Sequence, residues 1–428
     1  MEYSVEKLIE KINFEKEKAI ENGIIRKEKP QKEISDREKY CKLPDTWIWI
    51  RLGDYCLKAT DYVASGSFAS IKENVNYYNT ENYAIMVKTA DFANNFTKNL
   101  TYTDESSYKF LSNSNLFGGE LILSNIGSIG KVFKVPYLNK PMTLASNTIM
   151  IKFTDDKLAD YMYYYFKSNY GQNAIKSISS GTSMLKFNKT QLKTLPIPIP
   201  SIEIQEKIVT ALDKAQYLID KKKEQIDLLD ELVKSRFVEM FGDPNCNNKN
   251  WKIKKFKDVS SNKDSDRVPI KQADREKRSG KYPYYGATGI IDSIDGYIFD
   301  GLYLLISEDG KNLETKNKDI AFLAEGKFWV NNHAHVIKET NESNLYYLKY
   351  AINNMNLKPY ITGIDQLKLN RGNLDNIELP IPPIELQNEF AEFVTKIDEI
   401  KSKMEATLSE LEDNFNSLMQ KAFKGELF

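Results

Sequence analysis

Three side chains in the second half of the chain have the types and the order of a metal-dependent nuclease centre. Asp309 precedes the triplet Glu325-Gly326-Lys327. In such a centre an Asp and a Glu-x-Lys lie on adjacent strands, and the carboxylates hold a divalent metal ion that activates water. The triplet arises easily by chance in a lysine-rich chain, and the corresponding segment of the first half lacks it. A nuclease that uses Asp309, Glu325 and Lys327 is therefore the alternative function.

His333 and His335 are the only histidines in the sequence. Residues two apart on a strand point to the same face, so this pair would suit a metal ion. No third histidine accompanies them, and Cys41, Cys56 and Cys246 have no metal-like spacing. We therefore expect hydrogen bonding or contact with a nucleic-acid base, and no metal site.

The sequence lacks the usual signatures of nucleotide chemistry. No glycine-rich loop ends in Gly-Lys-Ser or Gly-Lys-Thr, so no ATP site of that kind is expected. No Asn- or Asp-Pro-Pro-aromatic tetrapeptide, the mark of adenine methyltransferases, is present, and Asp243-Pro244-Asn245 is interpreted as a turn that ends a helix. The sequence predicts a chain without catalytic residues of its own.

The composition is that of an ordinary soluble protein: of 428 residues, 41% are hydrophobic and 28% are charged. No apolar run approaches the roughly 20 residues of a membrane helix, and the charged amino terminus does not resemble a signal peptide. Three cysteines without framework spacing suit a reducing compartment, so a cytoplasmic location is expected. With a net charge of +0, binding to DNA would depend on local patches and shape, as in a subunit whose partners share the phosphate contacts.

The elements that would position such side chains occur twice. Two motifs recur with the same offset of 182 residues: Gly181–Leu192 (GTSMLKFNKTQL) as Gly363–Leu374 (GIDQLKLNRGNL), and Pro198–Gln205 (PIPSIEIQ) as Pro380–Gln387 (PIPPIELQ). The segment that begins at Trp47 is echoed from Trp251 with an offset of 204, so the two middles differ by 22 residues, and they barely match in sequence. This pattern indicates a repeated frame that carries two different readers; a duplicated domain whose copies drifted is the alternative. Two equivalent modules need two equivalent binding places, such as the halves of a DNA duplex or two identical subunits.

Each copy of the frame leads into a long helical pattern. The first begins after Pro200-Ser201 and stops at Gly242-Asp243-Pro244, and the second begins after Pro382-Pro383 and ends before Gly425. About 37 residues each correspond to roughly 55 Å. Two such helices, each with one apolar stripe, are expected to pack antiparallel and to act as a spacer of fixed length. The alternative is that each helix covers a sheet of its own domain.

The two middles are predicted to be α/β, with short strands between glycine turns and short helices near 157–169 and 345–354. The segment Lys327–Lys338 (KFWVNNHAHVIK) alternates like one strand. The loops are rich in Asn, Ser, Lys, Tyr and Gly, which supply the donors, acceptors and stacking groups of groove reading. The same residues are ordinary turn formers.

Taken in order, the chain resembles the DNA-specificity subunit of a type I restriction-modification system. The motifs G-x3-L-K-x-N-x3-L and P-I-P-[S/P]-I-E-[I/L]-Q, each followed by a long helix, carry the resemblance over Leu43–Phe428, and KYPYYGATGII with GKFWVNNHAHVI strengthens it for the second half. It implies two target recognition domains that each read one part of a bipartite double-stranded site. It also implies two helical regions that space them and dock two adenine-methylating modification subunits.

The resemblance further implies that restriction subunits, which cut and translocate DNA, join this core. S-adenosylmethionine would belong to the modification subunits, and ATP and magnesium to the restriction subunits, so that this chain does no chemistry. The expected architecture is α/β, a pseudo-two-fold repeat of two globular domains separated by an antiparallel helix pair. The expected segments are an N-terminal helical arm at 1–40, a first target recognition domain at 41–197, a central spacer at 198–244, a second target recognition domain at 245–379 and a distal spacer at 380–428.

Polar residues of the glycine-flanked loops are the candidates for DNA contact. They are Asn125, Ser128, Lys131, Ser146 and Asn147 in the first half, and Tyr285, Thr288, Lys311, Asn331, Asn332 and His333 in the second. Other polar residues belong to the shared motif: Lys186, Asn188, Lys368, Asn370 and Arg371. Shared residues cannot encode two different targets, so we expect backbone contact or a structural role at the base of the helices.

Overall fold

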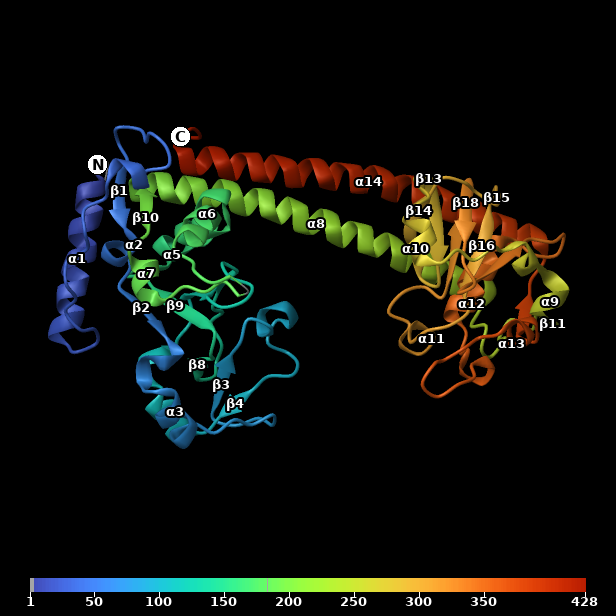
Figure 1. Cartoon of the computed structure of the whole chain (residues 1–428), viewed down its shortest axis with the longest axis horizontal. Helices are drawn as coiled ribbons and strands as arrows, with labels where there is room; N and C mark the ends of the chain where they lie inside the picture. Colours follow the sequence, from blue (N-terminus) through green and yellow to red (C-terminus); the bar gives the residue numbers. More distant parts are fainter. Residues whose placement is uncertain (1–3, 183) are drawn as a thin grey trace. The chain divides into compact units, whose positions relative to one another are not determined.

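The computed structural model describes residues 4–182 and 184–428, which form two compact units. The first unit comprises Met1–Asp220 with Ser409–Phe428, and the second comprises Lys221–Leu408. Two long helices, α8 (Ile202–Phe241) and α14 (Ile384–Lys424), each contribute one part to each unit (Figure 1). Each unit therefore joins one globular α/β module to segments of both long helices.

The same set of short elements, which we call the frame, precedes and follows each module in the sequence. In the first unit Ile48 lies opposite Ile199 in an antiparallel pair of strands, and in the second Lys252 lies opposite Ile381. The offsets of 204 and 182 residues carry one pair onto the other, so the repeat predicted from the sequence is confirmed at the level of strand register. The frame elements are β1 (Ile48–Arg51), α2 (Leu52–Tyr55), α7 (Lys189–Lys193) and β10 (Pro196–Ile199) in the first unit, and β11 (Lys252–Lys255), α9 (Phe256–Val259), α13 (Arg371–Asp375) and β20 (Glu378–Ile381) in the second.

Each module contains two four-stranded sheets, and the strand orders correspond one to one. They are β2-β9-β6-β7 and β4-β3-β8-β5 in the first module, and β12-β19-β16-β17 and β14-β13-β18-β15 in the second. In both modules the central pair of the second sheet, β3 with β8 or β13 with β18, is parallel, and all other neighbours are antiparallel. The two middles therefore share one fold, although their sequences barely match.

The strands of the first module are β2 (Lys58–Asp61), β3 (Ala84–Val87), β4 (Tyr102–Thr103), β5 (Asn115–Leu116), β6 (Leu121–Ser124), β7 (Val132–Lys134), β8 (Met142–Leu144) and β9 (Thr148–Lys152). Those of the second are β12 (Ser261–Asn262), β13 (Ser279–Gly286), β14 (Gly289–Ile294), β15 (Phe299–Asp300), β16 (Tyr303–Ser307), β17 (Ala321–Ala324), β18 (Lys327–Val330) and β19 (Ala334–Lys338).

The core of each module lies between its two sheets. In the first module, Ile85 of β3 and Ile122 of β6 belong to one buried cluster. In the second, Phe328 of β18 and Leu305 of β16 do the same. The next residue of β16, Ile306, points to the other face of its sheet and packs with α12 (Leu345–Asn354) and the long helices. Alternation along the strand thus buries both faces, which makes each module a three-layer structure.

Within each unit the two long helices run antiparallel, as predicted. In the second unit Lys401 donates to Asp230 at 2.7 Å, and Arg236 lies 3.1 Å from Glu389, so numbers rise along α8 as they fall along α14. In the first unit the Tyr164 hydroxyl donates to Asp213 at 2.5 Å, and its ring packs on Phe415 of α14. Exposed ion pairs add little stability, so the buried aromatic contacts of each helix segment contribute most.

The structure differs from the elements predicted from the sequence in two details. The long helices have 40 and 41 residues, a few more than the estimate of about 37, although they begin and end at the predicted proline and glycine signals. The expected single strand at Lys327–Lys338 was wrong: β18 and β19 are separated by a turn. The side-chain oxygen of Asn331 accepts a hydrogen bond from the His333 N–H at 2.8 Å, the local bond by which asparagine forms turns.

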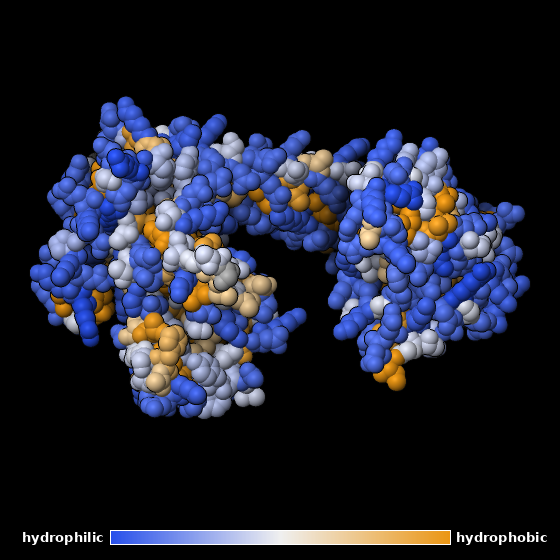
Figure 2. Space-filling model, viewed as in Figure 1, coloured by the Kyte–Doolittle hydropathy of each residue, from blue (hydrophilic) through white to orange (hydrophobic). Residues whose placement is uncertain are grey.

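The N-terminal arm is part of the first unit. Its helix α1 (Val5–Glu21) buries Leu8 and Ile12, and the Lys16 ammonium donates to the carbonyls of Gly53 and Asp54 at 2.8 and 2.7 Å. Of the part of the chain that the structure describes, no helix is long and apolar enough to span a membrane. The surface in view is mostly hydrophilic, with small hydrophobic patches (Figure 2).

Candidate nucleic-acid interface

In the second unit, polar loops gather at one edge of the two sheets. Tyr285 of β13 lies opposite Val330 of β18 in the parallel pair, so the carboxyl ends of both strands meet there. The Glu308 N–H donates to the carbonyl of His333 at 2.9 Å, and the Ser307 hydroxyl donates to the carbonyl of Ala287 at 2.5 Å. These bonds bring loops 287–288, 308–311 and 331–333 together, and we call this set of loops the second loop edge.

The structure places all six predicted residues of the second half at or next to this edge. Thr288, Lys311 and Asn332 are exposed in the loops and can reach a ligand. Tyr285 is half-buried against Phe322 and Phe328, and burial raises its pKa. Asn331 is 7% exposed, and its amide oxygen is used within the turn. His333 lies in the turn with Nδ1 2.7 Å from the Asp309 carboxylate. Tyr285 and Asn331 therefore shape the edge, whereas the others project from it.

The first unit has an equivalent first loop edge, formed by loops 88–101, 125–131 and 145–147. β3 and β8 are parallel and end together, and the Asn125 N–H donates to the carbonyl of Asn147 at 3.2 Å. Four of the five predicted residues of this half, Ser128, Lys131, Ser146 and Asn147, are exposed here. Asn147 has a φ of 66°, a left-handed conformation that asparagine tolerates well. The fifth, Asn125, is half-buried and its side-chain amide donates to the carbonyl of Phe187 at 3.0 Å.

Loop 88–101 is a part of the first loop edge that was not predicted from the sequence. It connects β3 to β4, whereas the corresponding β13–β14 connection of the second module is the tight turn 287–288. Several of its polar residues are exposed: Asn95, Thr97, Lys98 and Asn99. The prediction depended on glycine-flanked loops, and this segment contains no glycine, although its asparagine-rich run FANNFTKN was a usable signal.

The shared motif forms a hairpin on each loop edge. We call Ser180–Lys186, of which residue 183 is not described, the first hairpin, and Thr362–Lys368 the second hairpin. Each is closed by a backbone bridge between its end residues. In the first unit the Gly127 N–H donates to the carbonyl of Leu185, and in the second the Gly310 N–H donates to that of Leu367. The hairpins are thus attached to the variable loops by matching backbone bonds in both halves.

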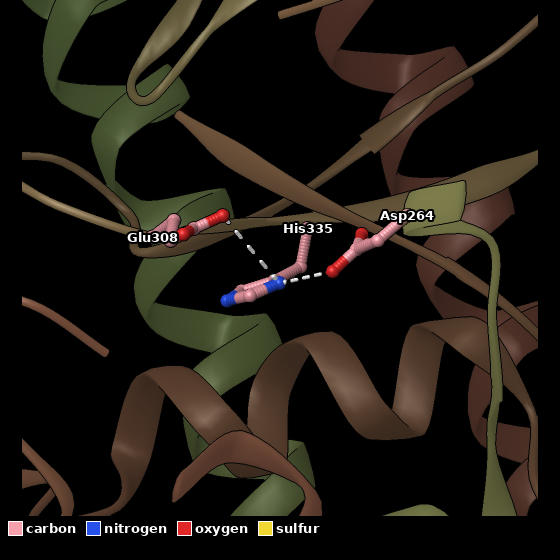
Figure 3. A group of neighbouring side chains, drawn as sticks. All are labelled: Asp264, Glu308 and His335. Carbon is pink, nitrogen blue, oxygen red and sulfur yellow. Dashed lines mark hydrogen bonds and ion pairs between the residues drawn. The ribbon is translucent and has the colours of Figure 1, made fainter. Parts of the chain in front are cut away.

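Three charged or polar side chains meet beside the second loop edge: Asp264, Glu308 and His335 (Figure 3). His335 is fully buried, with Nδ1 2.6 Å from Asp264 and Nε2 2.8 Å from the carbonyl of Leu369. The ring therefore lies between the Asp264 carboxylate and the residue that follows the second hairpin. Burial raises the pKa of Asp264, but the hydrogen bonds from His335 and the Val336 N–H outweigh this and lower it below its usual value.

By residue type, Asp264, Glu308 and His335 could ligate a metal ion, since one ligand atom from each lies within 4.8 Å of the others. Protein cations already neutralise the carboxylates. Arg267 lies 3.4 Å from Asp264 and 3.1 Å from Glu308, and Lys368 lies 3.3 Å from Glu308. The cluster is therefore best understood as a buried ion network that ties the second hairpin to the sheet. The expected hydrogen bonding of His335 is confirmed, but its shared face with His333 is not, because His333 lies in the turn and is 45% exposed.

The nuclease alternative was wrong. Tyr303, the first residue of β16, pairs with Ala324, so Glu325 lies at one end of that strand. Asp309 follows the other end, which puts the two acids roughly 17 Å apart along five residues of strand. The Lys327 ammonium instead lies 4.8 Å from the centre of the Tyr297 ring. Antiparallel pairing thus separates the groups that a metal centre would need close together.

Two modules with one fold, each with its own polar loop edge on a shared frame, define a class of protein that presents two recognition domains. A family model described as the type I restriction modification DNA specificity domain matches residues 44–230 and again residues 248–413. The chain belongs to this family, and the resemblance inferred from its motifs is confirmed.

Known relatives agree. A putative type I restriction enzyme specificity subunit of Haemophilus influenzae is 37% identical over 137 residues, which cover 32% of this chain and 34% of that protein, about a third of its length. A type I restriction enzyme specificity subunit of Methanocaldococcus jannaschii is 24% identical over 342 residues, covering 72% of this chain and 78% of that one. A chain in a solved structure of a type I restriction-modification system matches with a TM-score of 0.55 at 15% identity, covering 90% of this chain and 100% of that chain, and supports the fold.

Proposed function

We propose that this chain is the DNA-targeting subunit of a type I restriction-modification complex, in which each module reads one part of a bipartite double-stranded site. The observation that carries the proposal is one fold presented twice with different loop edges. The frames and strand orders match, whereas the exposed loop residues, such as Lys98 in one edge and Lys311 in the other, differ in position and surroundings. Phosphate contacts position a protein on DNA and base contacts specify the sequence, so different loops on one fold suit two different half-sites.

The proposed protein partners are two adenine-methylating modification subunits, one for each unit, and restriction subunits that cut and translocate DNA. Each unit repeats the same frame beside segments of both long helices, so a surface that docks on one unit has a counterpart on the other. In this proposal the chain itself contributes no catalytic residue and no cofactor. S-adenosylmethionine would be held by the modification subunits, and ATP and magnesium by the restriction subunits, within the cytoplasm.

The test is a module exchange guided by the frame. Residues 58–179 are replaced by the equivalent segment of a relative, which keeps β1, α2, the first hairpin, α7 and β10 in place. Methylated adenines are then mapped across the genome of cells that carry the variant with its modification subunits. We expect one half of the methylated motif to change and the other half to stay the same.

The matched control is the same exchange in the second module, at residues 261–361, which should change the other half of the motif. A change in both halves after either exchange, or a change in neither, contradicts independent readers. Loss of all methylation in a variant that still folds and still binds the modification subunits contradicts them as well.

A further inference from the structure

Most residues shared by the two hairpin motifs have a structural reason to be shared. Gly181 and Gly363 have φ values of 119° and 93°, and a Cβ at either would lie 2.3 or 2.2 Å from a carbonyl oxygen of its own hairpin. Asn188 and Asn370 cap α7 and α13, and each accepts a bond at 2.9 Å from the backbone N–H three residues on.

Three of the four shared leucines are also accounted for by burial, whereas Leu185 is 43% exposed. Leu192 and Leu374, the last residues of the motif, are fully buried. Leu367 packs against the main core of the second unit, and the carbonyls of Leu185 and Leu367 hold the hairpins on their loops. The expected structural role at the base of the helices therefore fits the two asparagines.

The lysine is the exception. Lys186 and Lys368 close their hairpins through backbone atoms alone, and any residue could make those bonds. The Lys186 side chain is exposed, and no polar partner for its ammonium is found among residues 4–182 and 184–428. Lys368 is 49% exposed and lies 3.3 Å from Glu308. Glu308 of the second unit corresponds to Asn125 of the first. The residue directly after each hairpin, Leu369 or Phe187, donates its backbone N–H to the carbonyl of Glu308 or Asn125, respectively. The two lysines thus occupy the same position of the shared motif, but no side-chain partner within the chain is common to both.

We propose that Lys186 and Lys368 each bind a backbone phosphate of DNA, beside the half-site that their module reads; this deepens the proposed function and rests on it. An ammonium is a compact point charge that binds phosphate and carries no base information. One residue type can therefore serve two half-sites of different sequence, as a shared motif requires. Because each hairpin is bonded to its loop edge, a phosphate held by the lysine fixes the distance from the DNA backbone to the base-reading loops. The Lys368 side chain is half exposed, so its ammonium can contact a phosphate while Arg267 continues to balance the buried Glu308 carboxylate.

The test measures the salt dependence of DNA binding by the full chain in complex with its modification subunits. Lys186→Gln and Lys368→Gln are compared with the parent complex on duplexes with and without the methylated motif. Loss of one phosphate contact should reduce the slope of log affinity against log salt by about 0.9, and weaken binding about eightfold at ~0.1 M salt. The loss should be equal on both duplexes, and the methylated motif should not change. The Lys→Arg variants should keep the slope.

Lys327→Gln is the matched control, since Lys327 is an exposed lysine at the end of β18 remote from the second loop edge. It should leave both slope and affinity unchanged. An unchanged slope in the hairpin variants overturns the proposal, as does a loss confined to the target duplex, which would indicate base reading. Loss of a modification subunit from the variant complex in native mass spectrometry would assign the lysines to protein docking instead. If the parent complex itself shows no salt-dependent binding to DNA, the proposed function fails and not the lysine assignment alone.

Discussion

At the scale of single residues, the two histidines make a matched pair. His335 is fully buried between Asp264 and the carbonyl of Leu369, whereas His333 is 45% exposed beside Asp309. His335→Ala takes one donor from the buried Asp264 carboxylate and leaves the buried Leu369 carbonyl without its side-chain donor, so we expect a loss of about 3 kcal/mol in the free energy of unfolding. His333→Ala should cost under about 1 kcal/mol, because its partner can be rehydrated. Denaturant unfolding of the full chain measures both; equal costs would contradict the ion-network interpretation.

The same network predicts the effect of a chelator. Arg267 and Lys368 already balance the two carboxylates, so a divalent cation would add charge where none is needed. EDTA should therefore leave the thermal unfolding midpoint of the purified chain unchanged. A lowered midpoint that magnesium or zinc restores would show that the three side chains hold a metal ion after all.

The sequence indicated many of these residues but not how they are connected. Glycine-flanked loops identified 125–131 and 308–311, because positive-φ turns need glycine and end strands at recognisable places. Loop 88–101 was missed because residues other than glycine take its left-handed positions: Asn95, Phe96 and Asn99 have φ values of 50°, 58° and 54°. The link between Asp264 and His335 was invisible, since only the pairing of β12 with β19 brings such distant positions together.

At the scale of elements, α8 is the place to test the spacer. The boundary between the two units falls within it, after Asp220, and no module residue interrupts it there. Four helix-favouring residues inserted between Ala215 and Gln225 would lengthen α8 by about 6 Å. DNA rises about 3.4 Å per base pair, and α14 stays unlengthened, so we expect the unread gap of the methylated motif to grow by roughly one to two base pairs.

Four residues are close to one helical turn, so the apolar seam of α8 stays nearly in register and folding should survive. Methylome sequencing of cells carrying the insertion with its modification subunits gives the gap directly. Both half-site sequences should be unchanged. An active variant with an unchanged gap would show that the helices do not set the spacing.

The helices were the elements best predicted from the sequence, and the strands the least. Pro200-Ser201 and Gly242 are strong local signals, and they bound α8 within a residue or two. The strand break at Asn331 was missed because the apolar positions on its two sides, Val330 and Ala334, stay in phase, although the Asn331-Asn332 pair was a usable turn signal. The identical strand order of the two middles was also beyond the sequence, since each buried position accepts several apolar side chains and the copies share few of them.

At the scale of the whole molecule, duplication predicts stoichiometry. Each unit offers the same frame with segments of both long helices, so one copy of this chain should bind two modification subunits and methylate only when both are present. Native mass spectrometry of the co-expressed complex, with a methylation assay on each species, gives the ratio. An active species with one modification subunit per chain, and no other active species, would contradict this prediction.

The first unit draws on both ends of the sequence. Its aromatic residues Tyr161 and Tyr165 pack against Phe423, with ring centres 5.3 and 5.6 Å apart, yet Phe423 belongs to Ser409–Phe428. During translation, the ribosome has made the whole second module before it makes the residues that cover these tyrosines. A premature stop codon before Ser409 therefore exposes the core of the module that was synthesised first, while the second unit, Lys221–Leu408, already has all its residues.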